Sequence, residues 1–150
     1  METTNYDNFS FEEICLCDYA TVTYCENLKM AICTATSDYI PISDFKTIFL
    51  KISEYIDNYP INYFLFDKRS LRTFHQPSME WYFAVWKPEM KMKGLCDHFK
   101  ILPKLDWFEK AVEAGKHEIF QKYGKDILAG ISVTYVQSVE GAIDSIVSAK

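Results

Sequence analysis

The chain has 150 residues, of which 49% are hydrophobic and 25% are charged, a composition typical of a globular domain. Its formal net charge is -5, which disfavours a general nucleic-acid binder or a protein of acidic membrane surfaces, since both need clustered Lys and Arg. No apolar run reaches the length of a membrane span, and the polar N-terminus lacks the layout of a signal peptide. We therefore predict a cytoplasmic protein without a membrane span, with a flexible tail over residues 1–11 and a single domain over residues 12–150.

The cysteines and histidines do not predict a metal centre. There are five cysteines, and an odd count without a signal peptide favours reduced thiols. The three histidines are scattered, and no Cys-x-x-Cys spacing accompanies them. No phosphate-binding loop or Gly-x-Gly-x-x-Gly pattern is present, so we expect no metal and no cofactor.

The first third of the chain is predicted to form strands followed by a helix. Residues 14–18 and 20–26 are rich in β-branched residues, Tyr and Cys, and after a turn residues 29–36 form a second extended run. These segments predict either a hairpin or three short strands. A helix should follow Pro41, with Ser43 or Asp44 as its N-cap. Its apolar stripe consists of Phe45, Ile48, Phe49, Ile52 and Ile56.

The middle of the chain combines a buried strand, a polar loop and an aromatic helix. Residues 63–66 are continuously apolar, which is typical of a central strand covered on both faces. A loop over residues 68–77 leads to a helix with Ser78 as N-cap. Pro88 should kink or end this helix, and Gly94 should stop it. Its inward stripe is predicted to be Met79, Tyr82, Phe83 and Trp86.

The last third continues the alternation of strand and helix. Residues 99–102 form a short apolar run, and residues 105–123 give the longest helical pattern. Gly115 within that helix indicates a close contact or a bend. Residues 131–136 alternate as a strand, and Ser138 should cap a final helix. The order β-β-α-β-α-β-α-β-α predicts an α/β layer with a mostly parallel sheet and an antiparallel N-terminal hairpin.

Several local patterns resemble one protein family. They are the strand Tyr63–Asp67 that ends in an acid, and the second helix with Glu80-Trp81 and Trp86-Lys87-Pro88. The strand of residues 133–136, followed by the helix start of residues 140–143, adds to them. With the element order, these patterns resemble the small single-domain bacterial proteins of the STAS / SpoIIAA-like superfamily. The resemblance covers roughly residues 20–147 and implies the fold of the anti-sigma-factor antagonists.

The resemblance also implies a role in protein interaction. In the best-understood relatives, a serine at the start of the second helix is phosphorylated, and its state decides partner binding. Asp67 matches the acid at the strand end, but the family's Asp-Ser-Ser-Gly-Leu element is absent. The corresponding residues 75–79 read His-Gln-Pro-Ser-Met, so Ser78 lies about two positions late.

The loop and the second helix contain the candidate site residues. Asp67 follows a strand, where it either acts as a base or fixes the loop by accepting backbone N–H bonds, the more common role. Arg69, Arg72 and His75 either form a small anion site with the helix start at Ser78 or belong to a solvated loop.

The aromatic helix is the second candidate region. Trp81 and Val85 face a different direction from the inward stripe that contains Trp86, so the helix is apolar on two sides. This indicates a second core layer, a dimer interface or an apolar ligand groove, unless another helix covers it.

We therefore predict a non-enzymatic STAS-like interaction or regulatory domain, without catalytic residues, whose partner is another protein or a second copy in a homodimer. The alternative is a domain for a small apolar ligand or lipid, with the second helix as a pocket wall. An enzyme using Asp67 and His75 is the weakest hypothesis, because it requires both side chains to converge on one cleft.

Overall fold

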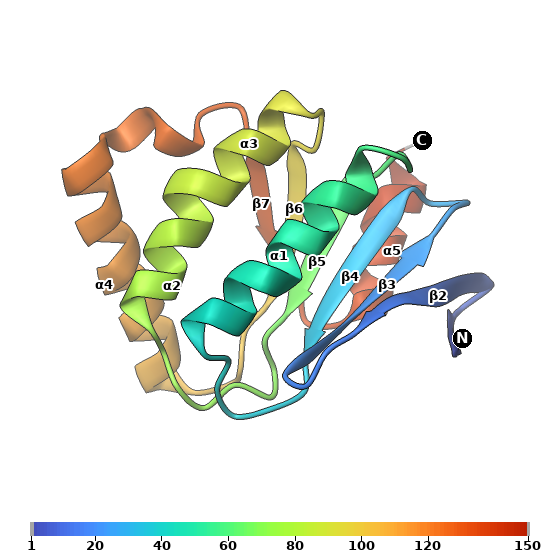
Figure 1. Cartoon of the computed structure of the whole chain (residues 1–150), viewed down its shortest axis with the longest axis horizontal. Helices are drawn as coiled ribbons and strands as arrows, with labels where there is room; N and C mark the ends of the chain where they lie inside the picture. Colours follow the sequence, from blue (N-terminus) through green and yellow to red (C-terminus); the bar gives the residue numbers. More distant parts are fainter. Residues whose placement is uncertain (1, 150) are drawn as a thin grey trace.

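A computed structural model describes residues 2–149 and shows a seven-stranded mixed sheet with helices on both faces (Figure 1). The strands are β1 (Thr3–Tyr6), β2 (Phe9–Leu16), β3 (Ala20–Cys25), β4 (Met30–Ala35), β5 (Tyr63–Asp67), β6 (Asp97–Ile101) and β7 (Ser132–Tyr135). The helical segments are α1 (Ile42–Ile56), α2 (Gln76–Trp81), η1 (Tyr82–Trp86), α3 (Lys87–Met92), α4 (Asp106–Tyr123), η2 (Lys125–Leu128) and α5 (Val139–Ser148).

The strands lie side by side in the order of the sequence, β1-β2-β3-β4-β5-β6-β7. Strands β1 to β4 pair antiparallel, whereas β4 to β7 pair parallel. The predicted α/β class is confirmed, and from β3 onward the elements follow the predicted order. The sheet is less parallel than predicted, because the N-terminal segment adds two antiparallel strands.

The tail prediction for residues 1–11 is wrong within the described residues 2–11. Strands β1 and β2 pair from Thr3↔Glu12 to Tyr6↔Phe9, and β2 continues onto β3. Phe11 is fully buried, and its ring meets Tyr6 edge to face at 5.5 Å. The mostly polar composition of the segment did not indicate that one aromatic ring, that of Phe11, packs against the sheet.

The helices cover the two sheet faces unequally. Consecutive parallel strands with right-handed crossovers place α1, the α2-η1-α3 helix and α4 on one face (Figure 1). After β7 the chain passes to the opposite side of the sheet, where α5 covers the other face. Each face has its own core, and the larger one lies beneath the three successive crossovers.

The helix starts show which capping predictions hold. Ser138 is confirmed as a cap, because its hydroxyl accepts a hydrogen bond from the Gly141 N–H at 3.0 Å. Neither Ser43 nor Asp44 caps α1, which begins at Ile42 directly after Pro41. The second helix also begins three residues earlier than predicted, with His75 rather than Ser78 in the cap position, so Ser78 lies within its first turn.

The second helix passes Pro88 through a widened turn. Tyr82–Trp86 forms a π-helical segment, and the Lys87 N–H bonds the Tyr82 carbonyl five residues back. Proline lacks an N–H and its ring clashes with the carbonyl four residues earlier, so a π turn lets the helix continue where a regular α-helix is obstructed. The buried side chains of the three segments are Ser78, Met79, Tyr82, Phe83, Trp86, Lys87 and Met90.

Gly115 marks a close approach between α4 and the start of α2. A Cβ atom at this position would lie 2.9 Å from the Phe74 ring and 3.0 Å from the Met79 sulfur. The Gly115 carbonyl also accepts a hydrogen bond from the Gln76 side chain at 3.3 Å. The predicted close contact is therefore confirmed, and it brings α4 against the beginning of the second helix.

No helix within residues 2–149 combines the length and the apolarity that crossing a membrane requires.

Replacing Phe11 by alanine tests whether the N-terminal strands belong to the folded core. The buried ring should make Phe11→Ala cost about 3 kcal/mol or more of unfolding free energy, measured by urea denaturation. Leu16→Ala is the matched control, because Leu16 lies on the same strand with 74% of its surface exposed. A Phe11→Ala variant as stable as Leu16→Ala would show that this segment contributes little to the fold.

Candidate functional site

A pocket opens where the strands β4 and β5 end and the loops to the next helices begin. Its lining comes from the β4–α1 loop, the β5–α2 loop, and the helices α1, α2-η1 and α4. This is the carboxyl edge of the parallel strands, where α/β folds commonly place ligand sites. The lining residues are Tyr39, Ile40, Phe45, Phe66, Lys68, Leu71, Thr73, Phe74, His75, Ser78, Met79, Tyr82 and Phe108.

Main-chain and side-chain bonds fix the loop that forms most of the pocket. Asp67 accepts the Arg69 backbone N–H at 3.1 Å and both Nε and Nη2 of the Arg69 guanidinium at 3.0 and 2.7 Å. The Arg72 N–H bonds the Asp38 carbonyl and ties this loop to the preceding one. Asp67 therefore has the loop-fixing role that its position after a strand predicts.

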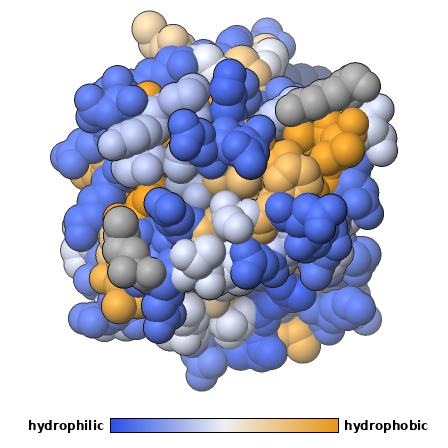
Figure 2. All heavy atoms as spheres, turned by 90° about the vertical axis from the view of Figure 1, so that its right-hand side faces the viewer, coloured by the Kyte–Doolittle hydropathy of each residue, from blue (hydrophilic) through white to orange (hydrophobic). Residues whose placement is uncertain are grey.

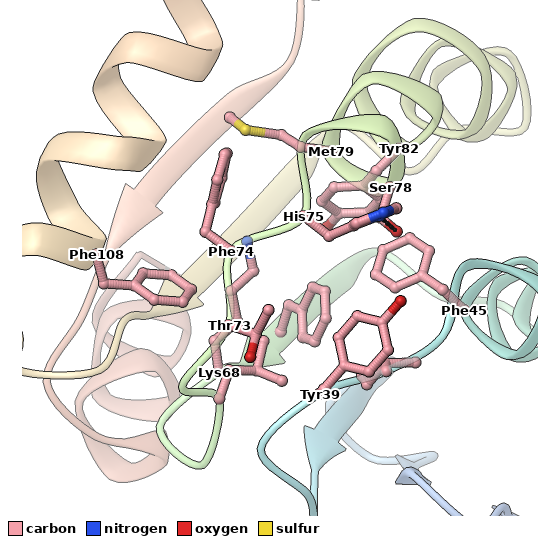
Figure 3. Close-up of a pocket in the computed structure, with 13 residues that line it drawn as sticks. Tyr39, Phe45, Lys68, Thr73, Phe74, His75, Ser78, Met79, Tyr82 and Phe108 are labelled. Carbon is pink, nitrogen blue, oxygen red and sulfur yellow. Dashed lines mark hydrogen bonds between the residues drawn. The ribbon is translucent and has the colours of Figure 1, made fainter.

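The pocket is narrow, and its walls are mostly aromatic and aliphatic. Its cavity volume is about 50 Å³, and the empty space including the open mouth is about 500 Å³. A cavity of 50 Å³ holds roughly four water molecules. Figure 3 shows the rings of Tyr39, Phe45, Phe74 and Tyr82 around the same space as the Lys68 side chain. Such a space suits a compact, largely apolar molecule.

Lys68 is the cationic side chain of the pocket lining. Only 8% of its surface is exposed, and its Nζ lies 4.9 Å from the centre of the Phe66 ring. The ion pairs among the described residues do not include it. Its ammonium group therefore faces aromatic rings without a carboxylate partner, which is an unusual position for a lysine.

Two more lysines lie deeper around the same aromatic side chains. Lys87 and Lys100 have no exposed surface, and within residues 2–149 neither Nζ has a hydrogen-bond partner. The Tyr82 ring centre lies 4.9 Å from the Nζ of Lys87, 5.8 Å from that of Lys100 and 5.9 Å from that of Lys68. We call these three side chains the lysine cluster; Lys68 alone lines the pocket.

Burial makes the charged form of these amines unfavourable. Desolvation, with repulsion from Lys116, lowers the pKa of Lys68 to about 8. Desolvation is also the main reason that the pKa values of Lys87 and Lys100 lie well below the ordinary value, and the other lysines lower them further. The charged form is thus disfavoured at the two interior amines, and the amine at the pocket titrates near pH 8.

His98 completes the polar interior next to the cluster. Burial, with the nearby Lys87, lowers the pKa of His98 to about 3, so the ring is neutral at physiological pH. Its Nε2 lies 3.2 Å from the Leu95 carbonyl, which makes Nε2–H the donor and leaves Nδ1 as an acceptor. Nδ1 has no partner among the described residues.

The predicted anion site does not assemble from its three side chains. The Arg69 guanidinium is held by Asp67, and the Nη1 of Arg72 donates to the carbonyls of Arg69 and Leu71. His75 turns into the pocket instead, where its Nδ1 lies 2.9 Å from the Ser78 hydroxyl. Two of the predicted residues, His75 and Ser78, therefore line the pocket, and the two arginines do not.

The second face of the aromatic helix is covered only in part. Trp81 packs edge to face on Phe45 of α1 at 6.1 Å. Trp86 is fully buried, and its indole N–H bonds the Phe49 carbonyl at 2.9 Å. Val85 stays 48% exposed. On the second face, Trp81 thus packs on the neighbouring helix α1, whereas Val85 remains open to solvent.

The lysine cluster was not predicted, although the alternation of side chains along the strands indicates which strand lysines point into the core. In β5 the side chains of Phe64 and Phe66 point into the larger core, so the alternation continues to Lys68. In β6, Phe99 and Ile101 point to the α5 side, so Lys100 between them points to the larger core. A lysine whose side chain points to the same side of a strand as core residues is expected to be buried, even at the end of the strand.

Within residues 2–149, no three His, Cys, Asp or Glu side chains gather as a metal site. No protein-family model matches this sequence, and no curated protein or solved structure matches it.

The buried amines predict that stability increases with pH. Unfolding returns Lys87 and Lys100 to water, where each binds a proton, so higher pH disfavours the unfolded state. Between about pH 6.5 and 8.5, urea unfolding should show a rise of up to about 1.4 kcal/mol per pH unit for each lysine that is neutral in the folded state.

Lys87→Met and Lys100→Met should each reduce this pH dependence and raise stability at neutral pH, because methionine fills the space without a charge to desolvate. Lys110→Met, on the exposed surface of α4, should leave the slope unchanged. Stability that is constant over this pH range in the parent protein would contradict the burial of neutral amines.

Proposed function

We propose that the chain is a non-enzymatic, STAS-like domain that binds a small, mostly apolar molecule in the pocket at the end of β5. The observation that carries the proposal is the pocket itself, which is lined by aromatic and aliphatic side chains from three successive strand-to-helix crossovers. The second helix supplies one wall through Met79 and Tyr82. A cytoplasmic location remains part of this proposal.

The placement of the polar groups supports binding rather than turnover. The carboxylate of Asp67 is occupied by Arg69, and Asp67 does not line the pocket with His75. The acid and base pair of the enzyme hypothesis therefore does not converge on one cleft. Among the polar side chains of the lining, Lys68, His75 and Ser78 are suited to orienting one polar end of a ligand.

The resemblance to STAS proteins connects the pocket with regulation. The β5–α2 loop leads into the helix start where the partner-switch relatives carry their regulatory serine, and the same loop lines the pocket through Thr73 and Phe74. Binding of a ligand beneath this loop would change the surface that the loop presents. A protein partner or a second copy of the chain remains a proposal that rests on this resemblance.

The surface gives a test for the partner proposal. On the face shown in Figure 2, hydrophilic residues dominate and apolar residues occur in separate areas. On the helical side, Leu50 of α1 and Val85 of η1 are about half exposed. We expect light scattering coupled to gel filtration to show a dimer that Val85→Asp weakens, while the surface control Lys110→Asp does not. A monomer at all concentrations would contradict the homodimer.

Binding in the pocket is tested by methyl NMR. With the methionine methyl groups labelled by ¹³C, benzyl alcohol should shift the Met79 signal in a saturable way, because Met79 lines the pocket. The Met92 signal serves as an internal control, since Met92 is 89% exposed and lies outside the lining. Equal shifts at both methyl groups, or none at Met79, would contradict a ligand site at this position.

A further inference from the structure

We propose that the pocket selects small apolar acids, and that the Lys68 ammonium pairs with the carboxylate of the ligand. This inference rests on the proposed function and adds the chemical class of the ligand. The Lys68 side chain is more than nine-tenths buried and extends into the pocket (Figure 3).

Within residues 2–149, no carboxylate pairs with this amine. Asp67 precedes Lys68 directly, but the alternation of β5 directs it to the opposite face, where Arg69 binds both carboxylate oxygens. The other ion pairs of residues 2–149 involve Lys93, Lys116 and Lys122. A buried charge without a partner costs free energy, and a bound carboxylate would remove that cost at Lys68.

The lining defines the kind of anion. Lys68 is the sole lysine or arginine among the described residues that line the pocket. Lys87 and Lys100 are sealed from it, because their Nζ atoms have no accessible surface. One accessible ammonium group matches one negative charge, which favours a carboxylate over a doubly charged phosphate that needs several cationic donors.

The surroundings of the amine suit the rest of such a ligand. The Ser78 hydroxyl and His75 lie in the same lining and give the pocket further hydrogen-bonding groups. Phe45, Phe74 and Phe108 offer ring surfaces for an apolar body. An aromatic or short aliphatic carboxylic acid combines both features, with part of its apolar body extending into the open mouth of the pocket.

The experiment compares benzoate with benzyl alcohol, which has a similar shape and no charge. Both are titrated into the full chain, with the Met79 methyl signal and calorimetry as readouts. The parent protein should bind benzoate about tenfold or more tightly than the alcohol, as expected for a hydrogen bond to a buried charged group. Lys68→Met should abolish this preference and still bind the alcohol. Lys110→Met should behave as the parent.

The pH dependence gives an independent readout. The preference for benzoate should decrease as the pH rises past about 8, where the pKa of Lys68 lies, because a neutral amine no longer attracts a carboxylate. His75 and Tyr39 line the same pocket, and Lys116 of α4 and Cys33 of β4 influence Lys68. Benzyl alcohol, measured over the same pH range, corrects for titration of these neighbours.

The outcomes separate the two proposals. Binding of both probes by the parent without a preference for benzoate, or a preference that persists in Lys68→Met, would overturn the acid selectivity and leave the apolar pocket intact. Absence of binding of either probe at Met79 would overturn the pocket function as well. Circular dichroism and the melting temperature of Lys68→Met establish that the variant is folded, which is expected because methionine replaces a buried cation.

Discussion

The burial of lysine amines against one aromatic ring is the constraint on which this structure depends. Lys68, Lys87 and Lys100 surround Tyr82 between the sheet and the helices, where an unpaired ammonium group is strongly disfavoured. Two of these amines are sealed in the interior and shift toward the neutral form. The third stands at the wall of a pocket and keeps a charge that an external group can pair with.

The fold creates this arrangement through its topology. Sequential parallel strands place three successive crossovers on one face, so the carboxyl-edge loops converge above a single core. The π turn before Pro88 allows one continuous helix to bury Tyr82 and Lys87 against β5 and β6. Widened turns of this kind are frequent at functional sites. The pocket lies where the loop after β5 enters this helix.

Most of the architecture follows from sequence patterns, and the departures have physical explanations. Continuous apolar runs and helical periodicity identify the elements from β3 to α5, and Ser138 caps α5 as predicted. Strand β1 and the first part of β2 escaped because their polar residues hide Phe11, whose burial depends on contacts distant in sequence; the end of β2 falls within the segment 14–18 that was predicted as extended. At the site, the loop and Ser78 were identified. The role of Lys68 was missed because the loop was expected to begin at this residue, although the alternation that begins with Phe64 continues through it.

The protonation of Lys68 is the property on which the site depends most directly. NMR of ¹³C-labelled lysine side chains measures it as a function of pH. We expect the Lys68 signal to titrate near pH 8, well below the ordinary range of lysine side chains, and to titrate at higher pH when benzoate is bound. A Lys68 signal that titrates together with the exposed lysines and does not respond to benzoate would show that the amine is solvated, and would contradict a buried cation as the determinant of the site.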